Sequence, residues 1–276
     1  MHLGQDPESD TWAQQPLHIG VTDGNLMLPE HMHCGDDMPF LINAIYSQLF
    51  IRNQQLPDQY FLDHTILNLR NIQVHEINST ILNSIAPQEK FTYLSANSVT
   101  DQEYDYILPE VLHTFNPSGF SLHQLELKID APLMLLHNLD PIHGLYNGTC
   151  LRLIRSTCKI LECHVLNGDG GNNANNVVLI SRLTLDSGLE DSPVPFCHFQ
   201  FPVHLAYAMT INKAQGQTVK HVGLNLSTSV FSHGQLYVAL SCCTHPRNIK
   251  ILFPDDQQNT KTTNVVWNEV FRNLEL

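Results

Sequence analysis

Polar and basic side chains crowd into one short segment that follows an apolar run. Residues 205–218 read Leu-Ala-Tyr-Ala-Met-Thr-Ile-Asn-Lys-Ala-Gln-Gly-Gln-Thr, which is typical of a strand that ends in a polar turn. Open α/β sheets bind ligands at the carboxyl ends of their strands. Lysine and small polar groups there can hold a nucleic-acid backbone, a contact that positions the ligand without reading its sequence. The candidates are Thr210, Asn212, Lys213 and Gln217, beside Gly216, which permits close backbone approach.

A second segment, residues 234–241, reads Gly-Gln-Leu-Tyr-Val-Ala-Leu-Ser. Gln235 and Cys242 lie seven residues apart, so two helical turns place both on one face. The spacing of the apolar residues predicts this helix, and these residues are Leu236, Ala239, Leu240 and Cys243. The first segment alone is equally compatible with a polar loop that has no function. The second segment beside it favours a functional site.

Together, the two segments resemble motifs V and VI of Pif-type superfamily-one DNA helicases. Residues 133–140 (LMLLHNLD), followed by Asn147-Gly-Thr149, are similar to the insert-domain signature of that family. Residues 74–82 (VHEINSTIL) and 93–99 (YLSANSV) look closest to members encoded by Helitron transposons. The resemblance covers roughly residues 20–254 and identifies the chain as similar to the C-terminal half of such a helicase.

The resemblance implies a role for each matching residue. It implies an ATP-dependent 5′-to-3′ DNA helicase that takes part in rolling-circle Helitron transposition, with single-stranded DNA as partner. ATP and Mg²⁺ would be the cofactors of the complete enzyme, and this chain alone is expected to bind neither tightly. The implied DNA-binding residues are Thr210, Asn212, Lys213, Gln217 and Thr218. The implied nucleotide-facing residues are Gln235, Gly216, Gln215 and Arg70, where a solvated surface arginine is the alternative for Arg70.

One position departs from the family pattern. Family members carry an arginine where this chain has Cys242, and that arginine reaches the γ-phosphate of the nucleotide. An arginine in such a place stabilises transition-state charge and contributes ~10³–10⁵ in rate. A cysteine offers no fixed fork of donors. We therefore expect no intact catalytic residue in this chain.

The phosphate-binding motifs of an ATPase are also missing. A P-loop requires GxxxxGK[ST], and none of the 14 glycines is followed by Lys. No Asp is followed by Glu, so the Mg²⁺-holding acidic pair is absent as well. In the family both belong to an N-terminal RecA-like domain, which would precede residue 1. The chain alone is expected not to hydrolyse ATP.

The expected fold is α/β: a RecA-like second motor domain with a parallel sheet that lacks the P-loop, interrupted by a small Src-homology-type β-barrel. A strand at 61–68, a helix from 74 to 85 and a strand at 90–96 open the α/β pattern. The predicted domains are a linking segment at 1–60 with a short helix at 41–50, the first RecA-like part at 61–130, the inserted barrel at 131–200, the second RecA-like part at 201–254 and a tail at 255–276.

The composition limits the possible partners. The chain has 276 residues, with 14 Lys and Arg against 27 Asp and Glu, and its net charge is −13. This sign opposes binding that relies on phosphate contacts, so DNA binding needs a local basic patch or a partner domain. No secretory signal or membrane span is expected. Seven cysteines without a CxxC pair indicate reduced thiols in a cell. Nuclear localisation follows from the resemblance only.

Two other functions were weighed against the helicase. The clusters His31, His33 and Cys34, and Cys197 with His198, fit the usual zinc spacing poorly, so no metal site is expected. The chain could also be a non-catalytic module that binds single-stranded DNA or a protein, or a transposon remnant without a function. Because neither of these needs an intact ATP site, the sequence does not distinguish between them.

Overall fold

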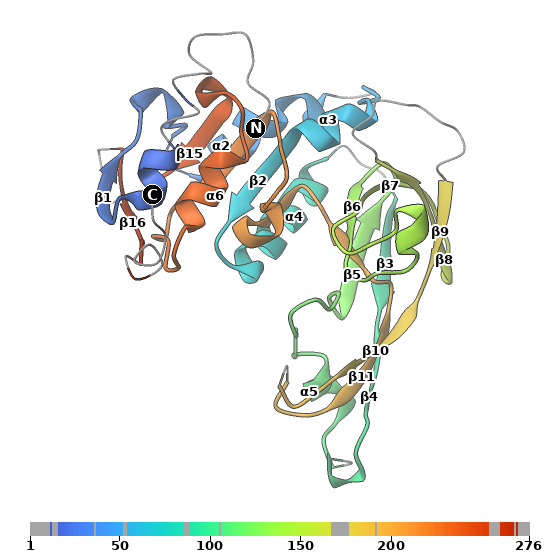
Figure 1. Cartoon of the computed structure of the whole chain (residues 1–276). Helices are drawn as coiled ribbons and strands as arrows, with labels where there is room; N and C mark the ends of the chain where they lie inside the picture. Colours follow the sequence, from blue (N-terminus) through green and yellow to red (C-terminus); the bar gives the residue numbers. More distant parts are fainter. Residues whose placement is uncertain are drawn as a thin grey trace. The chain divides into compact units, whose positions relative to one another are not determined.

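The computed structural model describes Trp12 and residues 16–35, 37–51, 54–85, 89–104, 106–166, 177–190, 192–253, 260–267 and 269. The chain forms two compact units. The first unit contains residues 1–84 and 207–276, and the second contains residues 85–206. The second unit is therefore inserted between two parts of the first (Figure 1).

A four-stranded parallel sheet forms the centre of the first unit, in the order β13-β2-β14-β15. Its strands are β2 (His64–Asn68), β13 (Ala208–Thr210), β14 (His221–Asn225) and β15 (Ile249–Leu252). Nearly all their residues are buried, as expected for a parallel sheet that is covered on both faces. The predicted α/β fold with a parallel sheet is confirmed.

The remaining elements of the first unit surround this sheet (Figure 1). Its helices are α2 (Met38–Tyr46), α3 (Asp58–Asp63), α4 (Asn71–Ser84) and α6 (Gln235–Ser241), and residues 16–21 are also helical. Its 3-10 turns are η1 (Glu30–Met32), η2 (Ser47–Phe50), η5 (Ile211–Ala214) and η6 (Pro246–Asn248). A separate antiparallel pair joins β1 (Gly24–Met27) to β16 (Lys261–Asn264).

Helix α2 packs closely on strand β14. The Asp37 carboxylate caps its first turn by accepting the Phe40 amide, 3.1 Å away. A Cβ added to Gly223 in β14 would lie 2.9 Å from Ile45 Cγ1 and 3.2 Å from Leu41 Cδ1. The helix predicted at 41–50 therefore exists, but it belongs to the core. The expectation that residues 1–60 form only a linking segment does not agree with the structure, because α2 packs on the parallel sheet.

Helix α4 closes the outer edge of the parallel sheet. Strand β13 is the last strand on its side, so one side of its backbone has no neighbouring strand. The buried Asn78 amide fills that gap, because its Nδ2 donates to the Ala208 carbonyl at 3.0 Å and its Oδ1 accepts the Ala208 N–H at 2.9 Å. One side chain thus satisfies both groups that the missing strand would have paired.

Three expectations about the first unit need correction. The strand expected from residue 61 begins at His64, because residues 58–63 form α3. The strand expected at 90–96 is present, but it pairs antiparallel inside the second unit and is not part of the parallel sheet. A strand-helix-strand pattern fixes the order of elements but not their pairing. The predicted polar tail contains β16, whose polar sequence gave no strand signal.

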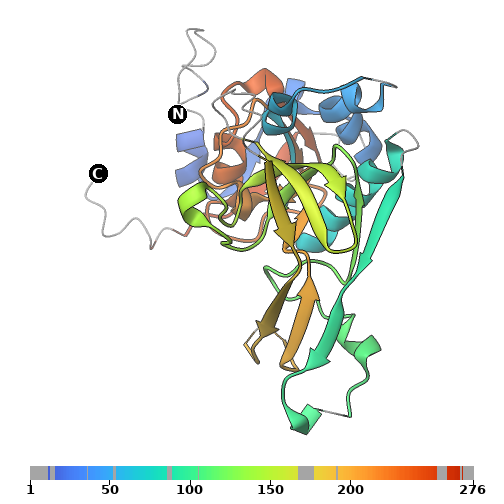
Figure 2. The ribbon, with the colours of Figure 1, turned by 90° about the vertical axis from the view of Figure 1, so that its right-hand side faces the viewer.

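The second unit consists of antiparallel sheets (Figure 2). A five-stranded sheet has the order β12-β6-β7-β8-β9, a three-stranded sheet β10-β11-β4, and a two-stranded sheet β3-β5. These strands are β3 (Lys90–Leu94), β4 (Ala96–Val99), β5 (Gln124–Lys128), β6 (Pro132–Leu135), β7 (Cys150–Ser156), β8 (Ile160–Val165), β9 (Val177–Ser181), β10 (Leu183–Ser187), β11 (Phe196–Gln200) and β12 (Val203–Leu205). Short helical turns η3 (Gln102–Tyr104), α5 (Pro109–Leu112) and η4 (Pro141–His143) join them.

The expected insertion of strands is present with different limits. The second unit begins at residue 85 rather than 131 and ends at 206 rather than 200. The run expected at 177–185 is two strands, β9 and β10. Among the described strands, β12 and β9 do not pair with each other, so the Src-homology-type barrel stays a prediction. The predicted hairpin tip at 167–176 lies outside the described residues.

A buried polar network lies inside the second unit. His198 Nδ1 lies 2.9 Å from Asn97 Oδ1, to which Ser95 Oγ also donates at 2.8 Å. His123 Nδ1 lies 2.8 Å from Ser95 Oγ, and its ring stacks on His113 with centroids 3.7 Å apart. Burial lowers the pKa of His198 to about 4, and the nearby His123 adds to this shift. The network therefore favours a neutral His198.

Candidate functional site

The carboxyl ends of β2 and β13 bring two predicted segments to the same edge of the parallel sheet. Thr210, the last residue of β13, lies in register with Asn68, the last residue of β2. The chain leaves the sheet there into residues 69–71 on one strand and into η5 on the other. Arg70 and the segment 210–218 were predicted from separate motifs, and this register places them at one sheet edge.

The polar turn after β13 is a single turn of 3-10 helix. Thr210 is half-buried at its start, and the exposed Asn212 lies within it. The backbone N–H of Gln217 donates to the Ala214 carbonyl at 3.0 Å and closes the turn. Gln217 Nε2 also lies 3.4 Å from the Lys213 carbonyl, so part of its hydrogen-bonding capacity serves the loop.

Gly216 is required by its conformation. Its φ of +80° lies in the left-handed region that favours glycine. No heavy atom of the chain lies within 4 Å of the position that a Cβ would occupy. Close approach to another described part of the chain is therefore not the reason for this glycine, and the expected close approach to a ligand stays a prediction. Its neighbours Gln215 and Thr218 are exposed.

Lys213 supplies the positive charge of this edge together with Arg70. Burial lowers the pKa of the half-buried Lys213 ammonium group. Burial also lowers the pKa of His75 on α4, and the charge of Lys213 adds to that shift. Lys213 therefore lies within electrostatic reach of α4, on the side of the sheet edge where Arg70 begins the helix. Arg70 is exposed, and its carbonyl accepts the Val74 amide at 3.1 Å.

Asn68 is a residue of this edge that the motifs did not single out. It is fully buried, and its Oδ1 accepts the Leu69 amide at 2.6 Å. Its Nδ2 has no hydrogen-bond partner among the residues that the structure describes. A buried donor without a partner is costly. The sequence signal for it was only a polar residue at the end of an apolar strand.

Gln235 lies at the first position of α6 and is buried. Its Oε1 accepts the backbone amides of Phe231 and Ser232, at 3.1 and 3.2 Å. The side-chain oxygen therefore organises the loop before α6. A nucleotide contact by Gln235 stays a prediction, and its Oε1 is already engaged.

Cys242 joins α6 to the polar turn. Its side chain is 2% exposed, and its Sγ donates to the Ala214 carbonyl at 3.3 Å and to the Val238 carbonyl at 3.1 Å. The Cys242 carbonyl accepts the Val219 amide at 2.8 Å. The position where the family has its arginine thus lies directly beneath η5. A substitution at residue 242 is therefore expected to affect the segment 210–218, which it contacts at Ala214.

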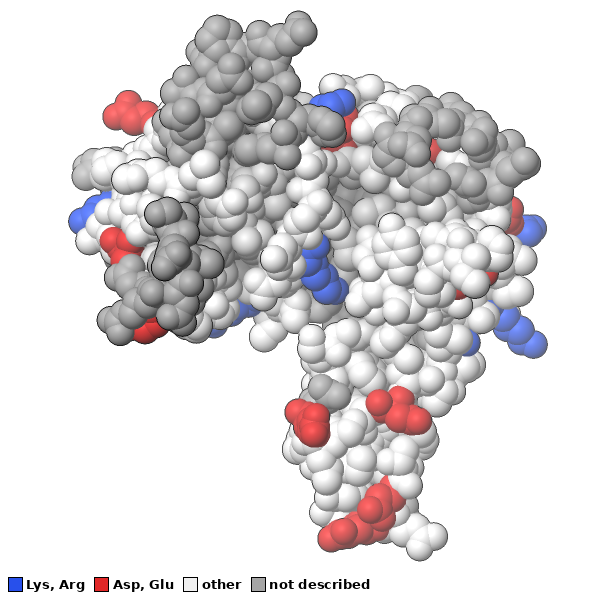
Figure 3. Space-filling view, in the orientation of Figure 1, with Lys and Arg blue, Asp and Glu red and all other residues white. Residues whose placement is uncertain are grey.

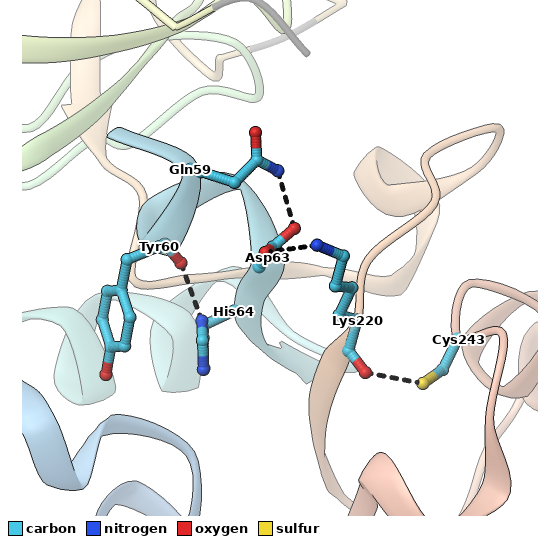
Figure 4. Close-up of polar contacts among 6 residues, drawn as sticks. All are labelled: Gln59, Tyr60, Asp63, His64, Lys220 and Cys243. Atoms are coloured by element: carbon cyan, nitrogen blue, oxygen red, sulfur yellow. Dashed lines mark hydrogen bonds and ion pairs between the residues drawn. The ribbon is translucent and has the colours of Figure 1, made fainter. Parts of the chain in front are cut away.

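The other end of the same sheet holds the segment after α6 in place (Figure 4). Lys220 Nζ forms an ion pair with Asp63 Oδ2 at 2.9 Å, and Gln59 Nε2 donates to the same carboxylate. The Lys220 carbonyl accepts Cys243 Sγ at 3.2 Å. These contacts attach Lys220, the residue before β14, to Asp63 on one side and to Cys243 on the other. They involve none of the predicted ligand-binding residues.

Neither a metal cluster nor a membrane helix is found in the part of the chain that the structure describes. No group of three or more His, Cys, Asp or Glu side chains there could hold a metal ion. Of the helices in the described ranges, none combines the length and the apolar character needed to cross a membrane. His31, His33 and Cys34 lie around η1, where the His33 ring packs near Phe253 at a centroid distance of 5.8 Å.

The sequence matches known helicases. The model of the DNA helicase Pif1 2B domain matches residues 110–155. The ATP-dependent DNA helicase Pif1 of Campylobacter jejuni is 48% identical over 201 residues, covering 68% of this chain and 42% of that protein. The human ATP-dependent DNA helicase PIF1 is 31% identical over 157 residues, covering 52% of this chain and 22% of that protein. The chain spans less than half the length of these curated relatives.

Solved structures agree with the sequence matches. Bacteroides Pif1 helicase in complex with ADP-AlF3 and ssDNA has a TM-score of 0.58 and 20% identity, covering 98% of this chain and 54% of that one. Bacteroides Pif1 bound to ssDNA has a TM-score of 0.51 and 25% identity, covering 77% of this chain and 44% of that one. The match with the first shows that the fold is shared. The sequence matches support a Pif1-type helicase, to part of which this chain corresponds.

Proposed function

We propose that this chain is the second motor domain of an ATP-dependent DNA helicase of the Pif/Helitron type. The observation that carries the proposal is the register of Thr210 with Asn68, because it gathers Arg70 and the segment 210–218 at one sheet edge. Relatives named as ATP-dependent DNA helicases match this chain, and solved relatives were captured with ssDNA and ADP-AlF3. From the family resemblance we also propose 5′-to-3′ unwinding within Helitron transposition as the activity of the complete enzyme. The same resemblance suggests the nucleus as its location.

In this proposal the polar turn contacts the DNA backbone. Thr210, Asn212 and Thr218 offer hydroxyl and amide groups, and Lys213 offers an ammonium group. Partial burial of Lys213 suits a phosphate contact, because an ion pair is stronger where water is partly excluded. Gln217 contributes through the side of its amide that the loop leaves available. The nucleotide side would comprise Arg70, Gln215, Gly216 and Gln235.

ATP and Mg²⁺ would be held mainly by a partner domain that carries the P-loop. This chain contains no GxxxxGK[ST] motif, and Cys242 stands where the family has an arginine. The residues present therefore supply one wall of a nucleotide site and no phosphate cradle. We propose that the chain alone does not hydrolyse ATP. Links to telomere maintenance, DNA repair or recombination follow only from the family.

The test joins this chain to the N-terminal motor domain of the Campylobacter jejuni relative and measures DNA-stimulated ATP hydrolysis. We expect the fusion to release phosphate in the presence of oligothymidine and the chain alone to release none. Lys213→Ala in the fusion should lower DNA stimulation by about tenfold, through the loss of a phosphate contact. Lys220→Ala is the matched control, because it removes the same charge from the opposite end of the sheet.

The arginine position is tested in the same fusion. Cys242→Arg should raise the maximal rate, and Cys242→Ser serves as a control that keeps a small side chain beneath η5. Equal rates for Cys, Ser and Arg would show that residue 242 does not reach the nucleotide. ATP hydrolysis by the chain alone, or equal losses from Lys213→Ala and Lys220→Ala, would overturn the proposal.

The alternative is a non-catalytic remnant of a transposon helicase that binds single-stranded DNA or a protein. The replacement of the family arginine by Cys242 favours it. Fluorescence anisotropy with labelled oligothymidine at low and high salt tests whether the chain alone binds single-stranded DNA. Affinity that falls with salt in the chain alone, without ATP hydrolysis in the fusion, would favour the remnant over the motor domain.

A further inference from the structure

One part of the second unit differs from the rest of the chain in charge. We call residues 95–121 and 183–200, which contain the three-stranded sheet β10-β11-β4, the acidic lobe. Its sequence contains no Lys or Arg and seven carboxylates. The whole second unit has thirteen carboxylates and six basic residues, so the acidic lobe carries a charge equal to the unit's net −7. The rest of that unit is neutral on balance.

The acidic lobe already has a core of its own. Leu112, Val194 and Phe196 are buried together, and Tyr104 and Phe115 pack against them with Val99 and Ile107. The apolar residues that face inwards are therefore satisfied within the lobe. Any large apolar side chain that is left on its outside does not serve this core.

Three such side chains lie within six residues around helix α5. Tyr106, Leu108 and Val111 are 78%, 65% and 44% exposed. Leu108 is the N-cap residue of α5, and its carbonyl accepts the Val111 amide at 3.0 Å, so the two residues belong to the same turn. Single exposed apolar residues are ordinary, but a contiguous group marks an interaction surface.

Carboxylates lie close to this apolar group in the sequence. Asp101, Glu103 and Glu110 are exposed on the same segment. In Figure 3 the lower part of the molecule shows red and white atoms and no blue atoms. Such a surface repels phosphate, so it does not suit DNA. Protein interfaces instead combine an apolar centre with a charged rim of complementary sign.

We propose that the α5 face of the acidic lobe docks a protein segment that presents Lys or Arg around apolar side chains. The apolar centre would contact Tyr106, Leu108 and Val111, and the basic residues would pair with Glu103 and Glu110. This function is separate from the sheet edge of the first unit, and it holds whether or not the chain is part of a motor.

The test uses the full chain and a synthetic amphipathic Leu-Lys peptide, with its Leu-Glu counterpart as the charge control. Fluorescence anisotropy should show salt-sensitive binding of the Leu-Lys peptide only. Tyr106→Ser with Leu108→Ser should weaken it by about tenfold, as for the central residues of an interface. Glu103→Gln with Glu110→Gln should weaken binding at low salt and flatten its salt dependence.

Matched controls decide the outcome. Ile142→Ser with Tyr146→Ser removes apolar side chains that are 91% and 53% exposed elsewhere in the second unit. Glu30→Gln with Glu76→Gln removes two exposed carboxylates of the first unit. Both controls should bind the peptide like the unaltered chain. Equal losses in test and control variants, or binding of the Leu-Glu peptide, would overturn the proposal.

Discussion

The two units of this chain place their polar groups in opposite ways. The first unit brings Thr210, Lys213 and Arg70 to the end of a parallel sheet, where they are at least partly open to solvent. The second unit buries polar groups such as His198 and Gln200 and carries its carboxylates outside. Polar groups at strand ends on a rigid scaffold are suited to ligands, whereas a satisfied buried network specifies structure. The difference agrees with our proposals, in which the first unit holds the ligand edge and the second unit holds a protein-docking face.

The largest expected effect on the stability of the first unit comes from replacing Asn78. Asn78→Ala leaves the Ala208 N–H and carbonyl buried without partners, and each such group costs about 1–3 kcal/mol. We expect the first unit to lose about 3 kcal/mol of stability. Both tryptophans, Trp12 and Trp267, belong to the first unit, so Trp fluorescence during urea unfolding reports on it alone.

The matched control is Asn83→Ala, which removes an exposed asparagine from the same helix α4. It should change stability by no more than about 0.5 kcal/mol. A similar small effect of Asn78→Ala would show that α4 does not stabilise the free side of β13. In that case the polar turn after β13 would not be held in the way that we describe.

Gly223→Ala should give the next largest effect. The added methyl group would lie 2.9 Å from Ile45 Cγ1 and 3.1 Å from Ile66 Cγ1, so α2 must move away from β14. Such overpacking costs about 1–3 kcal/mol. Gly188→Ala in the second unit is the control, because the nearest atom to its Cβ would be 3.9 Å away. Both variants are unfolded in urea and followed by far-ultraviolet circular dichroism, which reports on both units. Unchanged urea midpoints for both variants would contradict the close packing of α2.

Gly223 also illustrates what the sequence allowed us to predict. Strands β2, β14 and β15 and helices α4 and α6 were expected, because their apolar residues form continuous runs or recur at helical spacing. The approach of α2 to Gly223 was not expected, because it depends on a helix 180 residues earlier in the chain. The pairing of β3 with β5 was missed for a similar reason, since a strand does not carry its partner in its own residues.

The candidate site was predictable in part. The segment 210–218 was found because the polar residue types that follow a strand are visible in sequence, whereas Arg70 was proposed only from the resemblance to the family. The register that joins them was not visible, and neither was the burial of Gln235 and Cys242. Both properties depend on contacts between distant segments. Spacing on one helical face could not show that these side chains bond to the backbone.

The buried network of the second unit predicts a dependence on pH. The pKa of His198 is lowered to about 4 in the folded chain, whereas an unfolded histidine titrates near 6.5. Between these values the unfolded chain binds a proton and the folded chain does not. Stability is therefore fully present above about pH 6.5 and falls as the pH drops towards 4, by about 1–2 kcal/mol at pH 5.

His198→Gln should remove this acid sensitivity, because an amide can still donate to Asn97 Oδ1 without titrating. Hydrogen exchange of peptides from β11, measured at pH 7.5 and at pH 5 with correction for intrinsic exchange rates, reports on the second unit. The exposed His31→Gln is the control. Burial also lowers the pKa of His64 and His221, so the first unit should weaken in acid in both variants. A steep acid loss at β11 that survives His198→Gln would exclude His198 as its cause and would point to His123, whose pKa is also lowered by burial.

The smallest expected effect concerns the thiols, and it changes no stability. Burial raises the pKa of Cys242 and Cys243 to about 11, and the Sγ of each donates to backbone carbonyls. Alkylation requires the thiolate, so both should react slowly with iodoacetamide at neutral pH. Cys158, which is exposed, should react first. Mass spectrometry of timed digests would follow each site. Labelling of Cys242 as fast as Cys158 would mean that η5 opens readily. The polar groups of the first unit would then not lie on a rigid scaffold, and the comparison between the two units would fail.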